Sequence, residues 1–184
     1  MELDRIKKFL PNFFTLCNMT MGIIVIFVMI YSGTLHARRV ACFLIYIAAI
    51  FDFLDGCLAR YFDVVSDMGR QLDSFADIVT FGLAPFAVFM ANLQYLNWTI
   101  KLSLLFYVFA GAFRLSRYNL QKQYEYIIGL PITVSGFILA TVLFINSYIQ
   151  IEYTEIFLDF FFLLSLILSV MMVSKFRLDK RWRT

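Results

Sequence analysis

The sequence predicts an all-α integral membrane protein with six transmembrane helices. Hydrophobic residues make up 61% of its 184 residues, and the mean hydropathy is +0.78, whereas soluble domains average about 45–50% apolar residues. Six apolar stretches are each long enough to cross a bilayer core of about 30 Å as a helix. Short polar segments separate them, and no linker rich in Pro, Gly or Ser interrupts the chain. We therefore expect one membrane domain over residues 1–184.

The expected helices follow one another closely along the chain. Ser32-Gly33-Thr34 is the first turn, and residues 92–97, 121–126 and 150–154 form later connections. Apolar length then predicts six spans, at about residues 13–31, 40–60, 69–91, 98–117, 127–149 and 156–174.

The segment before the first span has its own pattern. In residues 1–10, apolar side chains gather on one helical face and basic ones lie elsewhere. This pattern favours a short helix lying in the membrane interface. A disordered tail is the alternative that the sequence leaves open.

Basic residues predict the orientation of the chain. An even number of spans puts both termini on one side, and positive charge concentrates on the cytoplasmic side of membrane proteins. Arg38, Arg39 and Lys101 lie on the other side. Both termini are therefore expected in the cytoplasm, at the plasma membrane. The remaining basic residues share the predicted cytoplasmic side: Arg5, Lys7, Lys8, Arg60, Arg70, Arg114, Arg117, Lys122, Lys175, Arg177, Lys180, Arg181 and Arg183.

Four aspartates stand out in this apolar chain. Asp52 and Asp55 are three residues apart, and Asp73 and Asp77 are four apart, so each pair shares one helical face. An antiparallel hairpin of the second and third helices would bring all four together. A helix rise of about 1.5 Å per residue places them about 10 Å below the cytoplasmic boundary. Acidic residues at this depth in a membrane usually have a functional role.

Four carboxylates in one place repel one another, and bound cations relieve that repulsion. Carboxylate oxygens suit hard divalent ions such as Mg²⁺ and Mn²⁺, with Ca²⁺ as a third candidate. Four carboxylates can hold two ions, which together clamp phosphates. Asp52, Asp55, Asp73 and Asp77 are thus predicted metal ligands. The cysteines Cys17, Cys42 and Cys57 lie in apolar runs and indicate small buried side chains.

The full pattern is Asp52-x2-Asp55-Gly56-x2-Ala59-Arg60-x8-Gly69-x3-Asp73-x3-Asp77. It resembles the motif of the CDP-alcohol phosphotransferase family at every fixed position. These are integral membrane enzymes that transfer a phosphoalcohol group from a CDP-linked donor to a hydroxyl, releasing CMP. Further patches resemble the phosphatidylserine synthase branch: Pro11-Asn12, residues 72–77, Phe81-Gly82-Leu83-Ala84-Pro85, residues 113–119 and Gly129-Leu130-Pro131.

The resemblance implies a donor, an acceptor and an assembly. The donor would be CDP-diacylglycerol or an ether-lipid analogue in the surrounding membrane lipids, the acceptor L-serine, and the products phosphatidylserine and CMP. Nucleic acid is not expected as a partner. Asp77 would also be the general base, because a serine hydroxyl must lose its proton during attack. A homodimer is expected from the resemblance alone.

Candidate binding residues surround the acids. Small residues at Gly56, Ala59 and Gly69 leave room for a ligand, which the resemblance suggests is the cytidine; helix packing is the alternative for Ala59. Arg60 can reach a phosphate or anchor at the interface. Asn12 and Thr15 could contact the nucleotide or cap a helix after Pro11.

Two arginines are the candidates for acceptor recognition. Arg114 and Arg117 end the fourth helix on the active-site side, and arginine binds carboxylates in a bidentate way. Membrane anchoring by positive charge is the alternative for both. Two other functions also remain open: the same chemistry on glycerol phosphate or inositol phosphate, and divalent cation transport. Relatives with phosphorylated acceptors usually have a basic residue after the last aspartate, where this chain has Ile78 and Val79.

Overall fold

A computed structural model describes residues 2–91, 98–120, 126–149, 155–175 and 177–179. Within these ranges, six helices are long and apolar enough to cross a membrane, which confirms the predicted class and makes the chain a multi-pass membrane protein. The spans are Phe9–Tyr31, Leu35–Tyr61, Asp67–Met90, Trp98–Leu120, Ile132–Ile149 and Glu155–Val173.

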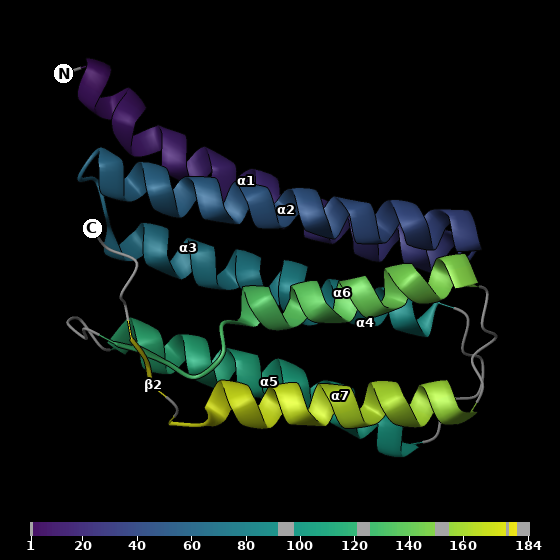
Figure 1. Ribbon diagram of the computed structural model, residues 1–184. Coiled ribbons are helices and arrows are strands. Elements are labelled where there is room, and N and C mark those ends of the chain that lie inside the picture. The colour runs from purple at the N-terminus through teal and green to yellow at the C-terminus, as the bar shows by residue number, and fades with distance from the viewer. Residues whose placement is uncertain (1, 92–97, 121–125, 150–154, 176, 180–184) are drawn as a thin grey trace.

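The first two helices form one side of the bundle (Figure 1). Helix α1 covers Glu2–Tyr31 and α2 covers Leu35–Tyr61, and they pack along their lengths. The helix predicted for residues 1–10 is not separate from the first span, because α1 continues through Pro11. A proline fixes φ at a helical value, so a helix can continue through it with one hydrogen bond lost. The interfacial placement of residues 1–10 stays a prediction.

The third span contains a change of helix type. It consists of α3 (Asp67–Asp77), the π-helix η1 (Ile78–Leu83) and α4 (Ala84–Met90). The hydroxyl of Thr80 donates to the Asn18 carbonyl of α1 at 3.1 Å, and Tyr107 donates to the Phe81 carbonyl at 3.3 Å. The π-helix therefore begins at the residue after Asp77 and is held from two neighbouring helices.

The remaining helices complete the bundle. Helix α5 (Trp98–Leu120) packs against α7 (Glu155–Val173), and α6 (Ile132–Ile149) packs against α2 and the π-helix. In Figure 1, α5 and α7 lie together on the side opposite α1 and α2, with α3, α4 and α6 between these pairs. The start of α1 and the end of α7 lie at the same end of the bundle.

The predicted start of the helix near residue 127 is wrong. Residues Tyr126–Ile128 form strand β1, which pairs antiparallel with β2 (Arg177–Asp179). Gly129 has φ +72°, and a side chain there would collide with the Met172 carbonyl. Residues before a proline avoid helical conformation, so α6 begins only at Ile132, after Pro131.

Candidate active site

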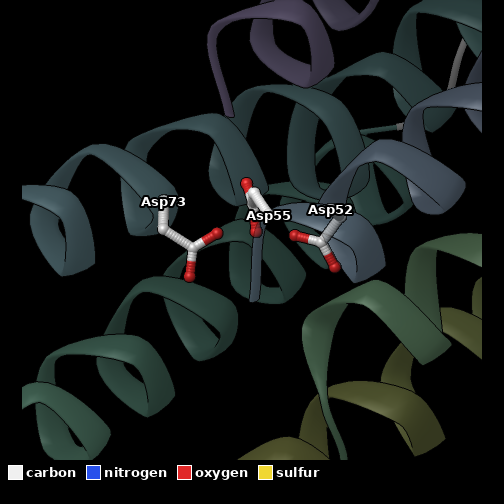
Figure 2. A group of neighbouring side chains, drawn as sticks. All are labelled: Asp52, Asp55 and Asp73. Atoms are coloured by element: carbon white, nitrogen blue, oxygen red, sulfur yellow. The ribbon is translucent and has the colours of Figure 1, made fainter. Parts of the chain in front are cut away.

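The acidic residues gather between α2 and α3, with α1 behind them. Asp52, Asp55 and Asp73 each offer a carboxylate oxygen, and these oxygens lie within 4.8 Å of one another. Figure 2 shows the three carboxyl groups turned toward a common space, two from α2 and one from α3. The α2 and α3 backbones each lie close to α1 but farther from each other. Side chains therefore fill the space between α2 and α3, and the acids of the predicted hairpin meet there.

Asp77 occupies the deeper part of the same cluster. It is 6% exposed and lies close enough to Asp52 for the two carboxyl groups to interact directly. One of its oxygens, Oδ1, is buried and has no hydrogen-bond partner among the described residues, and the same holds for Oδ1 of Asp73. Buried carboxylate oxygens without partners are costly. This donor set of oxygens fits a hard divalent cation.

Two threonines contact the aspartates. The hydroxyl of Thr15, on α1, donates to Asp55 Oδ2 at 2.6 Å, and that of Thr133, on α6, donates to Asp52 Oδ2 at 3.3 Å. Thr15 is buried, and its hydroxyl also lies 3.1 Å from the Pro11 carbonyl of its own helix, so it contacts both α1 and the acidic cluster. Thr133 was missed by the sequence analysis because it lies far from the motif in sequence, and nothing local marks it.

The candidate nucleotide residues lie on the side of the cluster nearer the α2–α3 connection. Asn12 Oδ1 lies 3.2 Å from the point where a Cβ on Gly69 would stand, so these two residues face each other across α1 and α3. Arg60 is exposed and folds back toward Gly56, with Nη1 3.4 Å from the equivalent point there. Ala59 is half-buried on the same helix, α2.

A methyl group at Gly56 would meet Arg60 first: the three nearest atoms all belong to that flexible side chain. Packing against another helix therefore gives no reason for glycine at this position.

The two candidate acceptor arginines have different surroundings. Arg114 is buried, its charge interacts with that of Asp77, and its Nε has no hydrogen-bond partner among the described residues. Arg117 instead donates to the carbonyl oxygens of Val173 and Ser174 at 3.1 and 3.3 Å, at the end of α7. Arg114 is thus buried within electrostatic range of Asp77, whereas Arg117 caps the end of α7.

Comparisons with known proteins agree with this geometry. The family described as CDP-alcohol phosphatidyltransferase matches residues 8–174. A protein of Bacillus subtilis named CDP-diacylglycerol–serine O-phosphatidyltransferase is 35% identical over 142 residues, covering 74% of this chain and 76% of the relative.

Two further relatives have the same name. One from Helicobacter pylori is 34% identical over 176 residues, covering 91% of this chain and 70% of the relative. One from Methanocaldococcus jannaschii is 35% identical over 144 residues, covering 76% of this chain and 63% of the relative. Because the family match includes all six spans and the whole acidic cluster, this chain belongs to the CDP-alcohol phosphatidyltransferase family.

Proposed function

We propose that this protein transfers a phosphatidyl or archaetidyl group from a CDP-linked lipid to the hydroxyl of L-serine, releasing CMP. The observation that carries the proposal is the shared name of its relatives, which match 74%, 91% and 76% of the chain at 34–35% identity. The cluster of aspartates supplies a site suited to this chemistry. CDP-diacylglycerol is the expected donor in bacteria, and its ether-lipid analogue is the alternative donor.

The aspartates would hold two divalent cations, Mg²⁺ or Mn²⁺, with Ca²⁺ as a third candidate. Asp52, Asp55 and Asp73 form the group whose oxygens lie within 4.8 Å of one another, and Asp77 would contribute to the second ion. Such ions would polarise the phosphates of the donor and offset the charge on departing CMP.

The side chains around the cluster divide the remaining work. Asp77 would accept the proton of the serine hydroxyl as its oxygen bonds to the phosphorus attached to diacylglycerol. The bond from that phosphorus to the CMP oxygen breaks in the same step. Arg114 is buried and its charge interacts with that of Asp77, so it is suited to bind the serine carboxylate. Arg117 is the weaker candidate, because its guanidinium already binds carbonyls of α7.

The nucleotide would bind on the side nearer the α2–α3 connection. Gly56 and Ala59 would let the cytidine approach α2, and Gly69 and Asn12 would face it from α3 and α1. Arg60 would reach a phosphate, and Thr15 would act by holding Asp55. The enzyme would lie in the plasma membrane with this site open to the cytoplasm. The homodimer stays a prediction.

The experiment is an assay of the purified full-length protein with CDP-diacylglycerol, radiolabelled serine and Mn²⁺. Labelled phosphatidylserine and equimolar CMP are expected, and removing the cation with a chelator should abolish both until Mg²⁺ or Mn²⁺ is restored. Parallel reactions replace serine by glycerol phosphate or inositol phosphate, and diacylglycerol by its ether analogue. Asp52→Asn is the control for a damaged metal site.

Each arm can contradict a different part of the proposal. Product from a phosphorylated alcohol but not from serine would show that serine is not the acceptor. Full turnover with chelator would show that the reaction needs no metal. Cation flux into vesicles without any lipid product would favour transport.

A further inference from the structure

Asn18 is a fully buried polar residue beside the acidic cluster. It lies on α1, its exposed fraction is 0%, and neither Nδ2 nor Oδ1 has a hydrogen-bond partner among the described residues. An amide left without partners is especially costly within a membrane, where water cannot replace them. Asparagine in a transmembrane helix often joins neighbouring helices through hydrogen bonds. Here the packing of the helices provides none, so helix association does not explain the residue.

The register of three helices places Asn18 at the level of the deeper aspartates. Thr15 donates to Asp55 across α1 and α2. Asn18 lies one helical turn beyond Thr15, and Asp52 lies one turn before Asp55 on the antiparallel neighbour, so Asn18 and Asp52 share a level. On the other side, the Asn18 carbonyl accepts from Thr80, one turn beyond Asp77. The side chain of a helical residue tilts toward the N-terminus of its helix, so the Asn18 carboxamide extends from the level of Thr80 back toward the turn that carries Asp77.

The side chains of Asn18 and Asp77 have complementary hydrogen-bonding groups. Asn18 Nδ2 is a buried donor without a partner, and Asp77 Oδ1 is a buried acceptor without a partner among the described residues. A neutral amide can hold a carboxylate without adding a positive charge that would compete with a bound cation. Partners that orient metal-binding carboxylates in this way are a usual part of metal sites.

We propose that Asn18 is a positioning residue of the metal site: when a cation is bound, its carboxamide donates to Asp77 or Asp52 and orients that carboxylate toward the ion. The proposal rests on the proposed function only in assuming that the aspartates bind a divalent cation. With Asn18 included, the site has two levels along the helix axes, and each level contains one residue from α1, one from α2 and one from α3. Thr15, Asp55 and Asp73 form the shallower level, and Asn18, Asp52 and Asp77 form the deeper one.

The test measures Mn²⁺ affinity by electron paramagnetic resonance on the purified full-length protein. Asn18→Leu keeps the branched shape of the side chain and removes the amide, and it should weaken Mn²⁺ binding by about 10–100-fold, the usual effect of losing such a partner. Turnover at low Mn²⁺ should fall with it and recover as Mn²⁺ is raised. Asn146→Leu is the matched control, because Asn146 is also buried, on α6 near the opposite end of the bundle. Its Mn²⁺ affinity should equal that of the original protein.

The outcomes separate this inference from the proposed function. If the original protein binds Mn²⁺, Asp52→Asn does not, and Asn18→Leu binds as tightly as the original, then Asn18 only fills space and the inference is overturned alone. If the original protein itself does not bind Mn²⁺, the proposed function fails as well. Should Asn18→Leu not fold, Asn18→Ala gives the same reading, because its smaller side chain cannot clash.

Discussion

Asp77 differs from the other aspartates in its surroundings, because it is the deeper of the α3 pair and its carboxyl group interacts with Asp52 and with the charge of Arg114. If Asp77 is the general base, it accepts the proton of serine only in the transition state. Asp77→Asn keeps the size and one ligating oxygen but removes the proton acceptor. We expect turnover to fall by about 10²–10⁴, the usual effect of losing general base catalysis, while donor affinity changes much less.

The measurement for Asp77 is a donor titration beside single-turnover rates. Asp52→Asn is the comparison, because it should weaken metal and donor binding together. If Asp77→Asn loses donor binding as completely as Asp52→Asn does, Asp77 is a metal ligand and another group is the base.

The arginines of α5 give a second prediction at this scale. Arg114→Ala should raise the KM for serine by at least about tenfold, or 1.4 kcal/mol, and leave the KM for the donor lipid nearly unchanged. Arg117→Ala should instead lower the stability of the protein, because it removes two hydrogen bonds that cap α7. Steady-state kinetics and unfolding in mixed detergent would distinguish them. Equal effects of Arg114→Ala on both substrates would point to folding instead.

At the scale of elements, the π-helix is the feature that the sequence analysis did not predict. A π-helix inserts one extra residue per turn and often occurs at functional sites. Here it starts directly after Asp77, and glycines let two helices approach it. A Cβ on Gly22 of α1 would lie 2.5 Å from Thr80 Oγ1, and one on Gly136 of α6 would lie 2.7 Å from the Phe81 oxygen. The fixed position of the π-helix therefore depends on close packing from both sides.

A pair of glycine substitutions tests which glycines serve packing and which serve the ligand. Gly136→Ala places a methyl group against the Phe81 backbone and should destabilise the protein by about 1–3 kcal/mol, the usual cost of overpacking. Gly56→Ala meets only the flexible Arg60 side chain, so stability should not fall, and alanine's higher helix propensity should raise it slightly. If cytidine approaches α2 at Gly56, donor affinity should nevertheless fall by about tenfold or more, or 1.4 kcal/mol.

Unfolding in sodium dodecyl sulfate and donor binding measure the two effects of the glycine pair. A Gly56→Ala protein that binds donor normally would remove Gly56 from the nucleotide site.

For the whole molecule, the distribution of basic residues predicts which side the site faces. Four arginines lie on helices near the end where α2 and α3 connect: Arg60, Arg70, Arg114 and Arg117. Arg38 and Arg39 lie at the beginning of α2, at the other end. Positive charge is retained in the cytoplasm, so the connecting end should face inward.

Single cysteines in a variant without Cys17, Cys42 and Cys57 would measure this orientation. His36→Cys and Val65→Cys place exposed thiols at opposite ends of α2. In intact cells, a membrane-impermeant maleimide should label His36→Cys, whereas Val65→Cys should react only after the membrane is permeabilised. The reverse pattern would place the site outside.

The sequence by itself determined the membrane class, the six spans and the family, because apolar length and a motif of fixed spacing are local properties of the chain. The spacing of the four aspartates also predicted that they lie on two helices, with each pair on one helical face. Local pattern could not place helix ends that depend on distant contacts. The late start of α6 combines a local signal with distant contacts. Pro131 disfavours helix before it, but the pairing of β1 with β2 and the packing of Gly129 against Met172 of α7 depend on the tertiary structure.

Only the tertiary structure decided which side chains join the aspartates. Thr133 comes from α6 and Arg114 from α5. The hydrogen bond from Thr133 to Asp52 and the charge interaction of Arg114 with Asp77 depend on how these helices pack. Arg114 and Arg117 look equivalent in sequence, yet their different helical faces send one to the acids and the other to the end of α7. The burial of Asn18 is likewise a property of the tertiary structure. Its spacing from Thr15 is visible in the sequence, but its full burial depends on the close approach of α1 to the π-helix.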